Sequence, residues 1–85
     1  MAAWTYVLDE AAFHFFLSCS ASQRRKLSVA FERLRADPHR EADYFCQDST
    51  GRTLSVGSFC PFLVTYWLDE FVTEIRIVNI QRIRF

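Results

Sequence analysis

Side chains that can bind metals or act as nucleophiles are few in this 85-residue sequence. There are two histidines, His14 and His39, and three cysteines, Cys19, Cys46 and Cys60. Neither set has the ligand spacing of a zinc site, so we expect no metal. The sequence has only two glycines and no Gly-Lys-Ser/Thr run, which excludes a phosphate-binding loop. We therefore expect no cofactor, and we expect the cysteines to be free thiols in a reducing cytoplasm.

Basic side chains are the other groups that could do chemistry, because cations stabilise the negative charge that develops on phosphate. The chain has ten basic and ten acidic residues, so its formal net charge is zero. A free-standing nucleic-acid binder usually has a basic excess, so any such role must rest on local patches. The run Arg24-Arg25-Lys26 could be a docking patch, and it also fits a solvated helix face.

The composition predicts a partner protein. Hydrophobic residues make up 51% of the chain and aromatic residues 16%. A single small domain, here residues 1–85, cannot bury all of this surface, and large exposed apolar patches often mark partner sites. The longest nearly apolar run, 59–68, is far shorter than the roughly 20 residues that span a bilayer. Because the N-terminal residues also lack the basic start of a signal peptide, we expect a cytoplasmic protein with no membrane contact.

A strand and two helices are predicted for the first part of the chain. Residues 4–8 alternate as in a strand, and Asp9 is a plausible cap for a helix that ends near Ser18. Its expected apolar stripe is Ala12, Phe13, Phe16 and Leu17, with Phe15 off to the side. Ser20 and Gln23 have the spacing of a capping box, and Pro38 ends the second helix. The expected buried face of this helix is Leu27, Ala30, Phe31 and Leu34.

After Pro38 the periodicity changes from helical to alternating, which indicates strands. The expected strands are 43–47, 52–59, 62–68 and 73–80, followed by a basic and apolar tail at 81–85. Asp48-Ser49-Thr50-Gly51 has the composition of a hairpin turn, and Asp69-Glu70 is a shorter turn. The predicted fold class is α+β: an N-terminal strand, a two-helix hairpin and a four-stranded, mostly antiparallel sheet with one face open.

This order of elements, together with several local motifs, resembles the RelE/ParE toxin superfamily over 4–84. The motifs are Ala36-Asp37-Pro38 after the helices, Gly51-Arg52 at the hairpin turn, Tyr66-Trp67-Leu68-Asp69 at a strand end, and an Ile-rich last strand. The resemblance implies the toxin of a type II toxin–antitoxin pair, neutralised by a cognate antitoxin and able to oligomerise through it. RelE-like members cleave messenger RNA on the ribosome without a metal, whereas ParE-like members block DNA gyrase.

Within this resemblance, three arginines are candidate catalytic residues. Arg82 falls where the family often keeps an arginine after the last strand, Arg84 follows two positions on, and Arg52 follows the hairpin turn. They would stabilise charge while the ribose 2′-OH attacks the neighbouring phosphate. Arg82 and Arg84 also fit a solvated basic tail, and Arg52 could instead pair with Asp48 or Asp43 across the hairpin.

The sequence also departs from the RelE pattern. Cys60-Pro61-Phe62 stands where these enzymes carry an arginine, and the sequence ends at Phe85 without their late tyrosine. Tyr66 is the nearest substitute but is expected in the core, and His14 and His39 fit surface or interface positions better than a general base. We expect inefficient RNA cleavage. A ParE-like protein that blocks gyrase without catalysis, or a non-toxic interaction domain of the same fold, remain alternatives.

Overall fold

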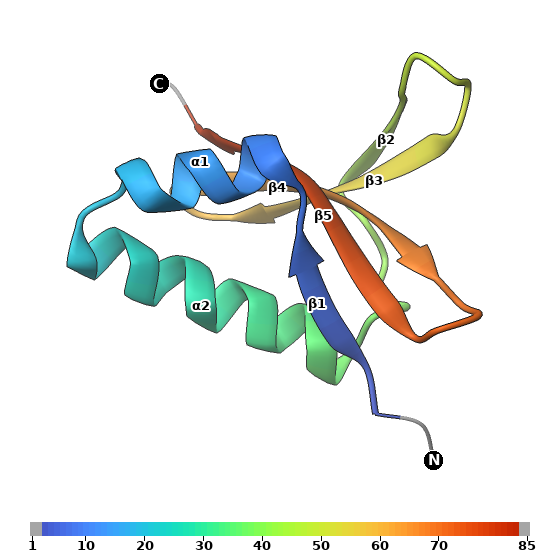
Figure 1. Cartoon of the computed structure of the whole chain (residues 1–85), viewed down its shortest axis with the longest axis horizontal. Coiled ribbons are helices and arrows are strands. Elements are labelled where there is room, and N and C mark those ends of the chain that lie inside the picture. The colour runs from blue at the N-terminus through green and yellow to red at the C-terminus, as the bar shows by residue number, and fades with distance from the viewer. Residues whose placement is uncertain (1–2, 84–85) are drawn as a thin grey trace.

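Two helices and five strands make up the chain in the computed structural model, which describes residues 3–83. Figure 1 shows their arrangement. In chain order they are β1 (Thr5–Leu8), α1 (Glu10–Ser18), α2 (Ala21–Ala36), β2 (Tyr44–Gln47), β3 (Thr53–Phe59), β4 (Phe62–Asp69) and β5 (Glu74–Arg82). The predicted α+β class and element order are confirmed. No helix in this part of the chain is long and apolar enough to span a membrane.

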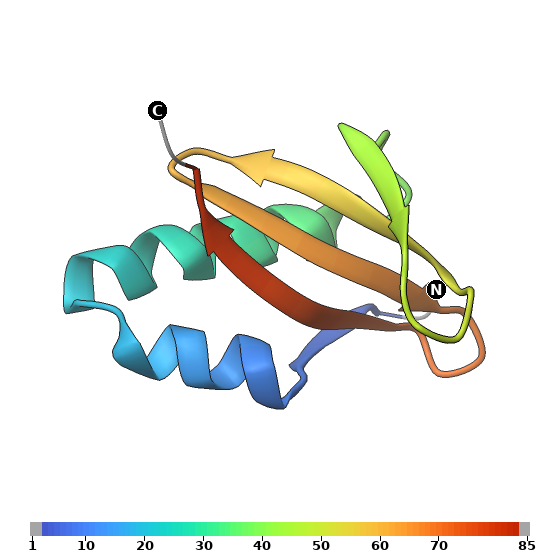
Figure 2. The same cartoon turned by 90° about the horizontal axis from the view of Figure 1, so that it is seen from above.

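The five strands form one mixed sheet in the order β1-β5-β4-β3-β2. Strands β2 to β5 pair antiparallel, as predicted, while β1 pairs parallel to β5 and becomes the fifth strand at one edge. The sequence did not place β1 in the sheet, because alternation predicts a strand but not its neighbour. Both helices lie against the same face, and the other face is free of helices (Figures 1 and 2).

Helix α2 forms as the sequence predicts. Ser20 Oγ accepts a hydrogen bond from Gln23 N at 3.2 Å, and Gln23 Oε1 accepts one from Ser20 N at 3.0 Å, so the capping box is complete. The predicted face is buried at 0–3% exposure: Leu27, Ala30, Phe31 and Leu34. These side chains pack against the helix side of the sheet.

The face that helix α1 presents to the core matches the predicted one only in part. Phe13 and Leu17 were expected inside but are 48% and 54% exposed. Ala12 is fully buried, and Phe15 and Phe16 pack against the core, with the Phe15 ring edge-on to Phe62. The predicted stripe was correct for Ala12 and Phe16 and wrong for Phe13 and Leu17. Aromatic residues allow two helical registers here, and contact with β5 selects the register that includes Phe15.

The core lies between the helices and one face of β4 and β5. Its sheet side consists of alternate residues that are almost completely buried: Phe62, Val64, Tyr66, Ile75, Ile77 and Ile80. The register of β4 and β5 shifts between Thr65 and Tyr66, which is a β-bulge that bends the sheet. Strand β5 continues to Arg82, so the first two residues of the predicted tail belong to the sheet.

The β2–β3 turn matches its prediction. Gly51 N donates to Asp48 O at 3.1 Å, and Gly51 has φ +85°, a conformation that glycine adopts without steric cost. Asp48 Oδ1 accepts from Thr50 Oγ1 at 2.6 Å and from the amides of Thr50 and Arg52. These bonds, first the one from the Thr50 hydroxyl, lower the pKa of Asp48. The β4–β5 turn extends from Glu70 to Thr73, beyond the predicted Asp69-Glu70.

Candidate functional site

The helix-free face of the sheet, which we call the open face, carries partly exposed side chains on β4 and β5, while Leu54 and Val56 of β3 are buried on it at 7% and 3% exposure. Directly paired residues share a face, so the register defines it. Across β3 and β4, Ser58 pairs with Leu63 and Val56 with Thr65. Across β4 and β5, Trp67 pairs with Arg76 and Thr65 with Asn79. On β2, Tyr44 pairs with Val56 and Cys46 with Leu54.

Arg52 and Trp67 form the most distinctive contact on this face. The guanidinium carbon of Arg52 lies 4.1 Å from the centroid of the Trp67 ring, which is a cation–π contact. The β2–β3 turn positions Arg52, because the Arg52 amide donates to Asp48 Oδ1 at 3.0 Å. Within residues 3–83 the guanidinium makes no ion pair within 4.0 Å, so the expected pairing with Asp48 or Asp43 is absent there.

Arg76 places a second cation beside Trp67, its partner across the β4–β5 ladder. Unlike Arg52, it is paired, with Asp9 Oδ1 at 3.3 Å and Glu74 Oε1 at 3.5 Å. Its Nε is buried and has no hydrogen-bond partner among the described residues. Two carboxylates thus balance the charge of Arg76. Arg52 makes no ion pair within 4.0 Å among residues 3–83, and its charge, after the hydrogen bond from the Thr50 hydroxyl, helps to lower the pKa of Asp48.

Arg82 lies on the other side of the sheet. It pairs with the buried Phe62, which puts its side chain on the helix side. Arg82 Nη2 donates to Gln23 Oε1 at 3.3 Å, and the guanidinium carbon lies 5.0 Å from the centroid of Phe15. Arg82 also lines an open hollow of about 870 Å³ at this end of the sheet, together with Leu63 and Gln81.

The structure does not bring Arg52 and Arg82 together. Arg52 stacks on Trp67 near one end of β4, and Arg82 pairs with Phe62 at the other end. These partners, Phe62 and Trp67, are five positions apart along β4, about 16 Å at the usual rise per residue, and the two arginines are on opposite faces. A single phosphate could not contact both. Arg84 lies outside the described residues.

The aromatic and imidazole groups considered as acid or base candidates lie away from the open face. Tyr66 is 2% exposed on the helix side, as predicted, and burial raises the pKa of its hydroxyl. His39 Nε2 lies 2.7 Å from Glu70 Oε1, and its ring is edge-on to Trp4. His14 is on the exposed side of α1, 4.0 Å from Glu10. Within residues 3–83, no cluster of His, Cys, Asp or Glu could hold a metal ion.

Two residues of the open face were missed by the sequence analysis, Arg76 as a cation beside Trp67 and Tyr44 as a half-exposed hydroxyl. Alternation in β2 puts Tyr44 on the face opposite Phe45, but the direction of that face follows only from pairing with β3. Arg52, Trp67 and Arg76 lie next to one another on the open face. Their aromatic and guanidinium groups can stack on a flat ring of a ligand, and the positive charge of Arg52 can attract an anion. Nucleotides offer both features, because aromatic and arginine side chains stack on bases while cations bind phosphates.

The chain resembles known proteins in its three-dimensional structure, whereas comparison of its sequence finds no match. No family model matches the sequence, and no curated protein matches it. Among solved structures, the chain is similar to a chain of the archaeal RelE–RelB complex from Pyrococcus horikoshii OT3, with a TM-score of 0.72 and 14% sequence identity. The match covers 95% of the present chain and 96% of the archaeal chain. It is also similar to the intact E. coli RelBE toxin–antitoxin complex, with a TM-score of 0.63, 13% identity, and coverage of 98% and 100%. The chain therefore has a RelE-like fold, as the sequence predicted.

Proposed function

We propose that this protein is the toxin component of a type II toxin–antitoxin system, that it acts on translation in the cytoplasm, and that a cognate antitoxin neutralises it. Two findings support the proposal. Both similar structures are complexes of RelE with RelB, and in each the matched chain is covered over nearly its whole length. The open face also carries a surface suited to RNA.

The observation that carries this proposal is the stacking of Arg52 on Trp67 on the open face. The guanidinium of Arg52, which lies on the Trp67 ring, offers a flat cationic surface on which a base can stack. Arg52 makes no ion pair within 4.0 Å in the described part of the chain, although its charge, after the hydrogen bond from the Thr50 hydroxyl, helps to lower the pKa of Asp48. Binding of a message strand along this face would place a phosphate near Arg52, where the cation stabilises charge during attack by a 2′-OH. Tyr44 supplies a hydroxyl two strands away on the same face. Arg82 is a separate phosphate contact at the opposite end of the sheet.

A toxin that binds and blocks its target without cleaving RNA is the second candidate, with DNA gyrase as the target. It is favoured by the burial of Tyr66 and by the position of both histidines away from the open face. Exposed apolar side chains would then carry the binding, and Phe45 and Phe71, 64% and 101% exposed, are suited to this. A non-toxic interaction domain of the same fold would use the same surfaces.

Pulse labelling after induced expression in a bacterial host separates these functions. We expect incorporation of labelled methionine to stop before incorporation of labelled thymidine, because translation is the proposed target. Primer extension on an abundant message tests for cleavage, and a supercoiling assay with purified gyrase tests the second candidate. Early loss of thymidine incorporation would favour gyrase, and undiminished growth would contradict both toxic functions.

A further inference from the structure

The β-bulge between β4 and β5 decides which side chains of β5 reach the open face. Ile77 and Asn79 pair with consecutive residues of β4, so Val78 is the extra residue and has no partner there. Side chains alternate between the two faces along a strand, and without the extra residue Asn79 would lie on the helix side and Ile80 on the open face. With it, Ile80 is 2% exposed in the core, and Asn79 is partly exposed on the open face, opposite Thr65.

The side-chain amide of Asn79 has no partner among the described residues. It makes no hydrogen bond within residues 3–83, and neither do the side chains of Thr65 and Gln81, its neighbours on the same face. All three are partly or fully exposed, and none is charged. These groups can therefore form hydrogen bonds to a ligand without first giving up a contact inside the protein.

Asn79 lies close to the place where Arg52 stacks on Trp67. Its partner Thr65 is two positions from Trp67 along β4, about 7 Å at the usual rise per residue. Adjacent strands are about 5 Å apart, so the backbones of Asn79 and Trp67 are separated by roughly 8 Å. A nucleotide next to one stacked on Arg52 can bring the edge of its base to Asn79.

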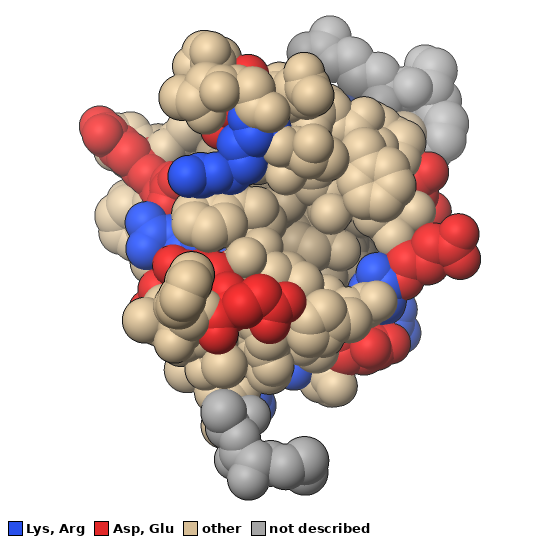
Figure 3. All heavy atoms as spheres, turned by 90° about the vertical axis from the view of Figure 1, so that its right-hand side faces the viewer, with Lys and Arg blue, Asp and Glu red and all other residues tan. Residues whose placement is uncertain are grey.

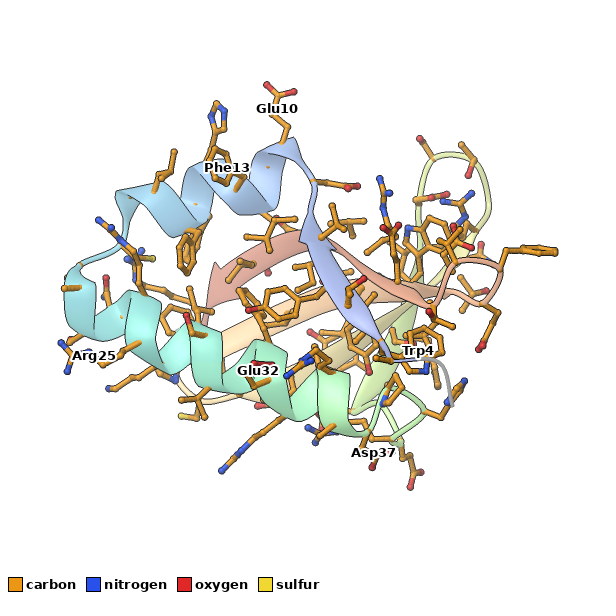
Figure 4. All side chains as sticks on the ribbon, turned by 60° about the horizontal axis from the view of Figure 1, so that its bottom comes forward. Trp4, Glu10, Phe13, Arg25, Glu32 and Asp37 are labelled. Atoms are coloured by element: carbon orange, nitrogen blue, oxygen red, sulfur yellow. The ribbon has the colours of Figure 1, made fainter. Side chains whose placement is uncertain are left out.

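Negative charge at one end of the sheet sets the direction in which a strand of RNA can run. Four carboxylates lie in or beside the β2–β3 and β4–β5 turns: Asp48, Asp69, Glu70 and Glu74. Figure 3, which views the end of the molecule with both turns, shows acidic side chains around an uncharged centre. Half of the ten basic residues are on α2, on the helix side of the sheet, where Figure 4 labels Arg25. The turns repel phosphates, so an RNA that stacks on Arg52 extends from there toward Asn79.

We propose that Asn79 reads the base of the nucleotide next to the one stacked on Arg52, and that it selects adenine. This selectivity rests on the proposed function, since it requires a strand of RNA on the open face. A carboxamide offers a donor and an acceptor side by side, which match N7 and the N6 amino group of adenine. Guanine presents two acceptors on the same edge, and cytosine and uracil present one partner each, so none of them satisfies both atoms of the amide.

Short fluorescent RNAs test the selectivity with the whole chain. Each is a strand of uridine in which one internal position is uracil, adenine, cytosine, guanine or 7-deazaadenine, and 2′-O-methyl groups block attack by the 2′-OH. We expect fluorescence anisotropy to show that the adenine RNA binds about tenfold more tightly than the others, as for one bidentate base contact. The 7-deazaadenine RNA lacks N7 and should bind like the uridine strand.

Two variants of β5 make the test specific. Asn79→Leu keeps a branched side chain but removes both hydrogen-bonding atoms, so it should abolish the preference for adenine and leave the affinity for the uridine strand unchanged. Gln81→Leu is the matched control, because Gln81 carries the same amide on the same face but pairs with Leu63, farther from Trp67. Trp67→Ala should weaken binding of every RNA alike, and circular dichroism should show that all variants are folded.

The outcomes distinguish this selectivity from the proposed function. Equal binding of the adenine and uridine RNAs, a preference that persists in Asn79→Leu, or a preference lost equally in Gln81→Leu would each overturn the role of Asn79 and leave the RNA-binding surface standing. Absence of binding to every RNA would overturn both, and the pulse labelling then decides separately whether the protein acts on translation.

Discussion

At the scale of single residues, the proposed function depends on an arginine that stacks on a tryptophan ring and makes no ion pair within 4.0 Å among residues 3–83. Arg52 stacks on Trp67, whereas Arg76 beside it is bound by Asp9 and Glu74. A cation that already has two carboxylate partners gains little from a phosphate, because it must give up existing interactions. Arg52 keeps its donors available, and Trp67 fixes its position without neutralising it.

The stacking predicts a specific pattern in double-mutant cycles. Arg52→Ala and Trp67→Ala should be coupled by about 0.5–1 kcal/mol in urea unfolding, the usual size of an exposed cation–π contact. Arg52→Ala and Arg82→Ala should be additive, because their side chains lie on opposite faces at opposite ends of β4. Additivity in the first cycle would show that the Arg52–Trp67 contact does not form in solution.

Tyr66 predicts a loss of stability in alkaline solution. Burial raises the pKa of its hydroxyl above the ordinary value of 10.0, so the fold keeps the proton that the unfolded chain loses. This contribution to stability is complete below pH 10 and is lost as the pH rises through the higher folded-state pKa. We expect the free energy of unfolding, measured in urea between pH 8 and 11, to fall less in Tyr66→Phe than in the wild type. Parallel curves for the two proteins would contradict this.

At the scale of elements, local chemistry predicted most of the fold and long-range packing decided the rest. The capping box at Ser20, the turn at Gly51 and the alternation of β5 each depend on nearby residues, and each was predicted correctly. The buried face of α1 was predicted only in part, because Phe13 and Phe15 are equally apolar and only contact with β5 distinguishes them. In the same way, the sequence indicated Arg52 and Arg82 as cations but not the faces to which they belong.

Helix α2 should depend measurably on its cap. Ser20→Ala removes the acceptor for Gln23 N and should cost about 1 kcal/mol, or roughly 4–8 °C in Tm for a domain of this size. Ser22→Ala is the matched control, because Ser22 lies inside the first turn of α2 and is not the cap. Thermal unfolding followed by circular dichroism checks both variants, and equal losses would contradict the role of the capping box.

At the scale of the whole molecule, apolar side chains remain exposed in several separate places, as the composition predicts. They occur on α1 with Phe13 and Leu17, on β2 with Tyr44 and Phe45, and at the β4–β5 turn with Phe71 and Val72. No single compact contact covers regions this far apart in the fold. An extended partner that follows the surface fits them better, which agrees with the proposed antitoxin.

The separation of surfaces also predicts which changes affect the target and which do not. The open face carries Arg52 and Trp67, whereas Arg35 lies on α2 on the other side of the sheet. Changes to the open face should therefore remove toxicity without unfolding the protein, and a change at Arg35 should leave toxicity intact.

Growth after induced expression in a bacterial host tests the central proposal most directly. Colony-forming units should fall with the wild type and with Arg35→Gln, and they should not fall with the double variant Arg52→Ala/Trp67→Ala. Immunoblots and circular dichroism must show equal amounts of folded protein in all three. If the folded double variant stops growth as fully as the wild type, the open face is not the surface that acts on the target.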